Sequence, residues 1–143
     1  MLIKLTKMEA AKFGDLIYAS VERVLSDYND PVDKGRLMQA LVSGVLEAWV
    51  VKYEESAIGI ITTSSWGSAI SNKVALLVYT IEVFDHRHLT KEFIEDVFDE
   101  LRKYAKKMGA VSIIGYTKNN SIVNIAKRLG ADVDVRTVEI EVY

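Results

Sequence analysis

The segment 73–84, "KVALLVYTIEVF", is the feature that most constrains how this chain folds. It is apolar on both faces, whereas a strand with one wet face alternates between apolar and polar side chains. A strand that is covered above and below carries such a continuous apolar run. The chain must therefore place helices against both faces of a sheet, which predicts an α/β fold.

Apolar residues at helical spacing mark the first third of the chain. After a short strand at residues 2–6, they recur every three or four positions from residue 7 to about residue 27, which predicts one helix. A segment around Pro31, the only proline, breaks this helix, and a second helix follows. The apolar side of the second helix is expected to consist of Leu37, Met38, Leu41, Val42 and Val45.

The period changes to that of strands after residue 46. Residues 47–67 predict a hairpin with a tight turn at 54–56. Beyond the apolar strand, Thr90 is suited to cap a helix that Gly109 ends. A buried strand (110–117), a short asparagine-led helix (119–130) and a half-buried strand (133–143) follow. The predicted order is β-α-α-β-β-β-α-β-α-β, a mixed sheet with helices on both faces, in one domain over residues 1–143.

Composition limits the classes of function. The chain has 20 acidic and 18 basic residues, a net charge of −2, so we expect no nucleic-acid partner. It has no cysteine, which excludes disulfides, thiolate nucleophiles and cysteine-bound metals. It has neither an apolar leader nor an apolar run of about 18 residues, so we expect a soluble, cytoplasmic protein without a membrane partner.

The two histidines, His86 and His88, lie in one short polar loop. A metal site would need further ligands, such as the carboxylate of Asp85, and an open coordination position. Because this set supplies too few ligands, we interpret the segment as an exposed loop and expect no metal.

The element order and several local patterns resemble the GNAT N-acetyltransferase superfamily over nearly the whole chain. The patterns are the hairpin "WVVKYEESAIGIITT" with Gly59, the strand end "TIEVF", the helix end Ala105-x-x-x-Gly109 and the segment "NNSIVNIAKRLGA". The resemblance implies transfer of an acetyl group from acetyl-CoA to an amine. It also implies that the pantetheine arm of acetyl-CoA lies along the backbone near Ile81 and Val83.

Two positions depart from the family pattern. The pyrophosphate loop, Arg/Gln-x-x-Gly-x-Gly/Ala, corresponds to residues 89–94, where Glu92 and Ile94 replace the glycines. The tyrosine that protonates the CoA thiolate in many members corresponds to Ala126. Acidic side chains in the first turns of a helix stabilise the helix but oppose a bound anion. The chain thus resembles a degenerate member without the glycine-rich loop, and this junction resembles a capped structural helix.

Several side chains near that junction are nevertheless candidates for binding acetyl-CoA. Arg87, His88 and Lys91 surround the helix start and offer side-chain donors to phosphates. Thr90 lies at the capping position, and Asn119 matches an asparagine that commonly positions the cofactor in the family. The alternatives are a solvated basic loop and simple helix caps.

Glu82 and Tyr116 are the candidate catalytic residues. Glu82 lies in the apolar strand, where burial is expected to raise its pKa and suit it to accept a proton from the amine. The alternative is a glutamate at the strand end that points into solvent. Tyr116, like Tyr79, is a candidate acid if it faces the same cleft, and otherwise belongs to the core.

Two functions remain open. The first is acyl-CoA-dependent acetyl transfer to a small-molecule or protein amine. The second is a catalytically inactive GNAT-fold domain, a pseudoenzyme that acts in a homodimer or with a protein partner. Trp49, Tyr53 and Trp66 flank the hairpin and would line an acceptor pocket or bind the partner. An open gap between the fourth and fifth strands favours the enzyme, and a gap filled by Tyr79 and Tyr116 favours the partner-binding domain.

Overall fold

The computed structural model describes residues 1–28, 30–117, 120–131 and 140. The mixed α/β architecture with helices on both faces is confirmed, and the last predicted strand (133–143) lies outside the described residues apart from Ile140. The elements, in chain order, are β1 (Leu2–Lys4), α1 (Lys7–Lys12), α2 (Gly14–Leu25), the 3₁₀ turn η1 (Ser26–Tyr28), α3 (Lys34–Ser43), β2 (Glu47–Tyr53), β3 (Ser56–Gly67), β4 (Val74–Val83), α4 (Lys91–Lys107), β5 (Ser112–Gly115) and α5 (Asn120–Arg128).

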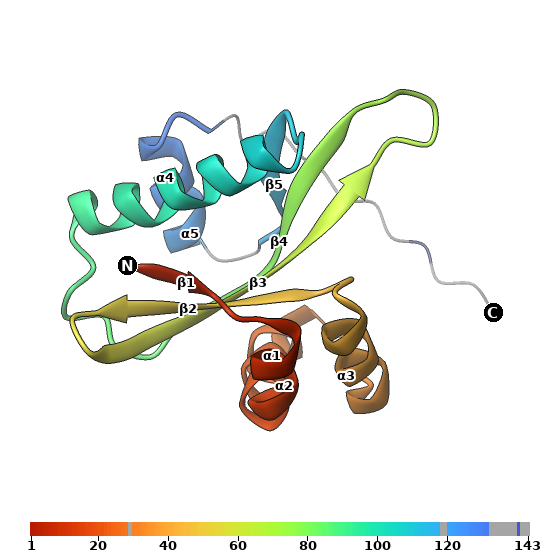
Figure 1. Cartoon of the computed structure of the whole chain (residues 1–143). Helices are drawn as coiled ribbons and strands as arrows, with labels where there is room; N and C mark the ends of the chain where they lie inside the picture. Colours follow the sequence, from red (N-terminus) through yellow and green to blue (C-terminus); the bar gives the residue numbers. More distant parts are fainter. Residues whose placement is uncertain (29, 118–119, 132–139, 141–143) are drawn as a thin grey trace.

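The five described strands form one sheet in the order β1-β2-β3-β4-β5. The pairs β1–β2, β2–β3 and β3–β4 are antiparallel, whereas β5 runs parallel to β4. Figure 1 shows α1–α3 on one face of the sheet and α4 with α5 on the other. The long strand β4 therefore lies between two layers of helices, as its continuous apolar run predicts, and Ala75 and Leu76 are fully buried.

Each face of the sheet has its own hydrophobic core. On one face α4 packs through Val97, Leu101 and Ala105. The buried residues of this core are Leu2, Trp49, Val51, Ile58, Ile61, Leu76, Val97, Leu101 and Ala105. The core under α1–α3 consists of Ala10, Ile17, Val21, Leu37, Leu41, Leu46 and Ala48.

The prediction of one helix over residues 7–27 is wrong, because the helix is broken at Phe13. Thr6 and Glu9 close a capping box at the start of α1, and Phe13 (φ −97°, ψ 18°) ends α1 and starts α2. Gly14 is buried there, and an added Cβ would lie 2.3 Å from the Cε atom of Met38. The missing side chain lets the start of α2 approach α3 closely.

The predicted apolar side of the second helix is also wrong in part. Leu37 and Leu41 are buried in α3, whereas Val42 and Val45 are 57% and 68% exposed. The helix ends at Ser43, and Gly44 follows in a left-handed conformation with φ +81°. Val45 therefore lies beyond the helix, and Val42 lies outside the core that contains its neighbour Leu41.

Among the described residues, no helix is long and apolar enough to cross a membrane.

Candidate functional site

The strand β4 changes its pairing halfway along its length. On one side β3 pairs with it from Val74 to Val83, but the register shifts between Thr80 and Val78, so Tyr79 is an extra, bulged residue. On the other side β5 pairs only with residues 75–78, ending at Val78 opposite Gly115. The bulge and the end of β5 pairing thus coincide.

Beyond the bulge, residues 79–83 of β4 have one edge that no described strand covers. Alternate residues of a strand direct their N–H and C=O groups toward the same edge. An extended ligand with amide groups can pair with such an edge as an additional strand would. Ile81 and Val83, which we expected to hold the pantetheine arm, both belong to this stretch.

Glu82 lies in the same stretch and is held by Arg23 of α2. The Nε and Nη2 atoms of Arg23 donate to the two carboxylate oxygens of Glu82, each at 2.7 Å. This hydrogen-bonded pair lowers the pKa of Glu82; burial opposes the shift, and a hydrogen bond with the Ser20 hydroxyl adds to it. The expected rise in pKa is therefore wrong, because it neglected a cation brought from a distant helix.

Two tyrosines near the ends of β4 and β5 are exposed. Tyr79 and Tyr116 are 45% and 59% exposed, so neither belongs to the core. Tyr28, at the end of η1, donates from its hydroxyl to Thr117 at 3.5 Å, which brings the segment after α2 next to the segment after β5. The ends of β4 and β5 are therefore bounded on one side by α2 and η1.

The junction between β4 and α4 is a capped helix start. The Thr90 hydroxyl accepts from the N–H of Phe93 at 3.1 Å, as its position predicts. The N–H groups of Leu89 and Thr90 donate to the carbonyls of His86 and His88. Most of the donors that a phosphate would need before the helix are therefore already used.

The two basic candidates before Thr90 are held in place by neighbours. Arg87 forms a forked pair with Asp85 through Nε (2.9 Å) and Nη2 (2.7 Å), which holds the pKa of Asp85 well below its usual range. The His88 ring stacks on Tyr53 at 3.8 Å between ring centroids, with the two planes almost parallel. The Nη1 group of Arg87 and the ring nitrogens of His88 take no part in these contacts, so both side chains remain candidates for binding a phosphate.

Lys91 lies differently, at the rim of a groove between the first turn of α4 and the last turn of α5. Leu89, Ile94, Ile125 and Leu129 line this groove, and Lys91 and Arg128 contribute its two cations. Lys91 reaches Glu95 only at 3.8 Å. The groove is small, about 70 Å³, so it can bind one end of a larger ligand.

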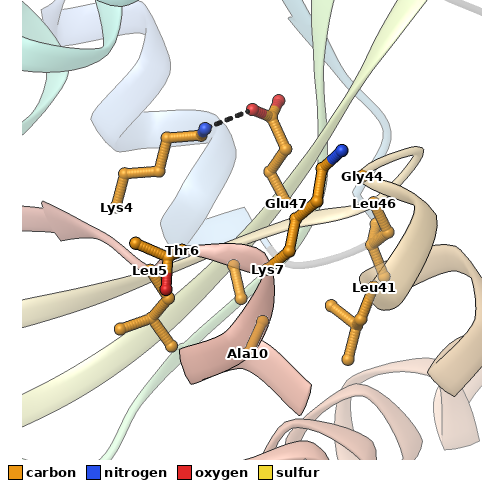
Figure 2. Close-up of a pocket in the computed structure, with 10 residues that line it drawn as sticks. Lys4, Leu5, Thr6, Lys7, Ala10, Leu41, Gly44, Leu46 and Glu47 are labelled. Carbon is orange, nitrogen blue, oxygen red and sulfur yellow. Dashed lines mark ion pairs between the residues drawn. The ribbon is translucent and has the colours of Figure 1, made fainter.

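A second hollow of about 70 Å³ lies between β1, α1 and α3, at the β1 end of the sheet, whereas β5 lies at the opposite end. Figure 2 shows its polar rim, where Lys4 and Glu47 point toward each other and pair at 3.0 Å. Glu47 also accepts from the hydroxyl of Tyr104. Because these groups satisfy one another, this hollow offers few free polar contacts to a ligand.

The remaining sequence candidates separate into core, surface and undescribed residues. Trp49 is 5% exposed and donates from Nε1 to Thr63 at 2.9 Å, so the expectation that it lines a pocket or a partner surface is wrong. Trp66 is 42% exposed near the tip of the β3–β4 hairpin. Asn119 lies outside the described residues. Within the described ranges, no group of three or more potential ligands is arranged to hold a metal ion.

Sequence reasoning missed one backbone feature and two residues of this region. The bulge at Tyr79 leaves no mark in a continuous apolar strand. Arg23 lies 59 residues from Glu82, and only the packing of α2 on the sheet brings them together. Arg128 was overlooked although its place in the last turn of α5 is visible in the sequence, because basic residues are common there.

Comparisons with known proteins identify the fold. No protein-family model and no curated protein sequence matches the chain. Among solved structures, an aminoglycoside acetyltransferase from an uncultured soil sample, in complex with sisomicin, matches with a TM-score of 0.73 and 15% identity, over 100% of this chain and 95% of that one. The ribosomal-protein-alanine N-acetyltransferase of Brucella melitensis matches with 0.68 and 16%, over 99% of each chain.

A third structure, AAC(6')-Iy in complex with a CoA-containing bisubstrate analogue, has a TM-score of 0.73 and 12% identity and covers 100% of this chain and 97% of that one. These identities are low, so the likeness concerns the fold. The chain has the fold of the GNAT N-acetyltransferases, as its element order and local patterns predict.

Proposed function

We propose that this protein is an acyl-CoA-dependent N-acetyltransferase that acts as a single domain on an amine acceptor. The observation that carries the proposal is the open edge of β4, which begins at the Tyr79 bulge where β5 pairing ends. Acetyltransferases with the same fold, one of them in complex with a CoA-containing analogue, support the reaction class. Fold alone does not determine activity, so the local geometry bears the argument.

In this proposal the pantetheine arm of acetyl-CoA pairs with the free backbone groups of β4 near Ile81 and Val83. Peptide-like amides on an unpaired strand edge bind through the same hydrogen bonds that join two strands. Tyr79 and Tyr116 are exposed and do not belong to the core, which is compatible with a ligand on that edge.

The phosphates need a different site from the glycine-rich loop of the family. We assign them to the groove that Lys91 and Arg128 line beside the first turn of α4. Two side-chain cations and the positive end of a 17-residue helix favour an anion there, while Glu92 in the first turn opposes it. Arg87 and His88, the other sequence candidates, contact Asp85 and Tyr53 but keep N–H groups that these contacts do not use and that would be further donors.

Two residues of this chain are assigned a role in the chemistry. The reaction joins the acceptor nitrogen to the acyl carbon and releases the CoA thiol. Glu82 remains the proposed proton acceptor, although its present pairing with Arg23 keeps it ionised and weakly basic. Tyr116, exposed just after β5, is the proposed proton donor to the thiolate.

Calorimetry with acetyl-CoA tests the proposal. The wild type should bind with a dissociation constant in the micromolar range, and binding should weaken as salt rises because exposed charges are screened. The double variant Lys91→Ala/Arg128→Ala should bind about tenfold more weakly, the equivalent of about 1.4 kcal/mol. The matched control, Arg102→Ala/Lys103→Ala, removes the same charges from the exposed middle of α4 and should bind like the wild type.

Absence of binding by the wild type at millimolar acetyl-CoA would refute the enzyme proposal. Equal losses in both double variants would refute the groove assignment alone, because they would indicate a general effect of net charge.

A second candidate function, a partner-binding domain without catalysis, rests on the tip of the β3–β4 hairpin. Figure 1 shows this hairpin extending beyond the rest of the sheet. Trp66 is 42% and Ile70 97% exposed there, and exposed apolar residues on a projecting element are typical of association surfaces. Sedimentation of the wild type and of Trp66→Ser/Ile70→Ser tests this function: a homodimer that dissociates in the variant supports it, and a monomer in both argues against self-association.

A further inference from the structure

We propose that Thr62 and Thr80 form a positioning pair for the coenzyme. The hydrogen bond between their buried hydroxyls fixes the bulge at Tyr79, and with it the place where the open edge of β4 begins. This inference rests on the proposed function and adds to it two residues that act through the backbone of β4, without touching the coenzyme.

The two threonines lie beside the bulge, on the two strands that form it. Thr62 of β3 pairs with Thr80 of β4. The next residue of β3 pairs with Val78, so Tyr79 has no partner on β3. The hydroxyls of Thr62 and Thr80 are hydrogen-bonded to each other, and the two residues are 0% and 3% exposed. Because a buried hydroxyl without a partner costs free energy, the two threonines favour the register in which they meet.

The bulge also changes which face of the sheet each side chain of β4 meets. Alternate residues of a regular strand share a face, so residues 78 and 80 would do so without it. Instead, Val78 and Ile81 pack against the core on the α4 face. Thr80 shares its face with Glu82, which contacts Arg23 of α2 on the opposite side of the sheet. The extra residue therefore brings Thr80 onto the face where Thr62 meets it.

The bulge is held in place from both directions along the strand. If it moved one residue further, to Thr80, Thr62 would lie opposite Tyr79 and the two hydroxyls would separate. Movement the other way is opposed by Val78, which pairs with β3 on one side and with Gly115 of β5 on the other. The hydroxyl pair thus acts on the side that faces the open edge.

The place of the bulge matters for the site because a bulge bends its strand and increases the local twist. Here the bend coincides with the last residue that β5 covers, Val78. It therefore sets the direction in which residues 79–83 leave β5 and present their backbone groups to a ligand. A bulge that wanders would leave the pantetheine arm an edge that is not preorganised, and binding would weaken.

Thr63 is a matched control within the same strand. It is as buried as Thr62, and its hydroxyl also has one partner, but that partner is the Nε1 atom of Trp49 on β2, at 2.9 Å. Loss of either hydroxyl should lower stability, because each leaves a buried polar group unpaired. Only the loss on Thr62 should alter β4.

Amide hydrogen exchange of the free protein tests the positioning role without acetyl-CoA. Thr62→Val/Thr80→Val replaces both hydroxyls by methyl groups, so no buried hydroxyl is left unpaired and the protein should remain folded. Protected amides at residues 79–83 should exchange about tenfold faster than in the wild type, and those at 75–78, between β3 and β5, less than about twofold faster. Thr63→Val should leave both stretches as in the wild type.

Calorimetry with acetyl-CoA, at a temperature where all variants are folded, gives the second measurement. The double valine variant should bind about tenfold more weakly than the wild type. Thr62→Ser/Thr80→Ser retains both hydroxyls and should restore binding to within about twofold. Thr63→Val should bind like the wild type although its thermal stability is lower.

Thr62→Ala is a further variant that keeps the inference testable if the double valine variant does not fold. Its smaller side chain leaves room for a water beside the Thr80 hydroxyl. Exchange at residues 79–83 should again be faster, by about threefold, with residues 75–78 unchanged.

Unchanged exchange at residues 79–83 in the folded valine variant would overturn the inference. Equal acceleration at 75–78, or the same response in Thr63→Val, would also overturn it, because the hydroxyls would then contribute only to general stability.

The two measurements separate this inference from the proposed function. Selective acceleration at residues 79–83 without any binding of acetyl-CoA by the wild type would support the hydroxyl pair as the support of the bulge and refute the acetyltransferase function. Binding of acetyl-CoA that the valine variant retains in full would refute the positioning role alone.

Discussion

Two glutamates of the sheet, Glu47 and Glu82, are equally buried and yet lie in opposite surroundings. Each side chain is 15% exposed, and each pairs with one cation, Lys4 at 3.0 Å and Arg23 at 2.7 Å. Glu47 also accepts from the hydroxyl of Tyr104, which packs edge-on against Trp49 at 4.9 Å between ring centroids. Glu47 is therefore part of a closed polar cluster attached to the core.

Glu82 has no comparable enclosure. Its partner is more exposed than Lys4, 58% against 41%, and its strand has an edge that no described strand covers. The difference teaches that burial of a carboxylate does not by itself mark a binding site. The two glutamates differ in the exposure of the paired cation and in whether the strand beside them has an open edge. The following predictions test that distinction.

The largest effect is expected from Gly59→Ala, near the start of β3 and opposite Val83 of β4. An added Cβ would lie 2.7 Å from the carbonyl oxygen of Glu82, and backbone cannot yield as a flexible side chain can. The variant should lose about 2–3 kcal/mol of unfolding free energy, measured by urea denaturation. Gly67→Ala, where no atom lies within 4 Å of the added Cβ, is the control and should change stability by less than about 0.5 kcal/mol.

A smaller effect should separate the two glutamates directly. Glu47→Ala leaves the partly buried hydroxyl of Tyr104 without its acceptor and should cost about 1–2 kcal/mol in urea denaturation. Glu82→Ala leaves Arg23 in water and should cost about 1 kcal/mol or less. Equal costs in stability would contradict the contrast between a closed and an open site.

The helix cap next to the open edge should contribute about 1 kcal/mol. Thr90→Ala removes the acceptor for the N–H of Phe93, whereas Thr90→Ser retains it. Only the alanine variant should be less stable in thermal unfolding. If the serine variant lost as much stability, the methyl group of Thr90 and not its hydroxyl would be the contributor.

The smallest effects are expected in the pH dependence of stability. The region around Glu82 should respond at acid pH, and the region around Tyr104 and Glu47 at alkaline pH. Arg23 lowers the folded pKa of Glu82, so its contribution is present above the unfolded pKa and is lost as pH falls through the folded value. Burial and Glu47 raise the folded pKa of Tyr104, so its contribution is present below the unfolded pKa and is lost as pH rises.

Urea denaturation across a pH series checks this assignment. Glu82→Gln should flatten only the acid limb of the stability curve, and Tyr104→Phe only the alkaline limb. A change in the same limb for both variants would contradict it.

Much of the fold was predictable because its determinants are local. The change of hydrophobic period near residue 46, the hairpin turn and the Thr90 cap each depend on neighbouring residues. The break at Phe13 was missed because the helical spacing of apolar residues continues through it from Phe13 to Ile17 and Val21.

The candidate site was predictable in position but not in electrostatics. The residues near the end of β4 were identified, and the open edge follows from how far β5 extends beside it. The pKa of Glu82 was predicted in the wrong direction because its dominant neighbour, Arg23, is distant in sequence. Arg87 was weighed as a phosphate ligand because a pattern of basic residues does not reveal that Asp85 is already bound to one of them.

Amide hydrogen exchange at residues 79–83 of β4, with and without acetyl-CoA, tests the central claim most directly. If the pantetheine arm pairs with the open edge, exchange should slow at amides of this stretch, while the amides at 75–78, already beside β5, should change little. Binding of acetyl-CoA with unchanged exchange at 79–83 would contradict the claim, because the coenzyme would then bind elsewhere.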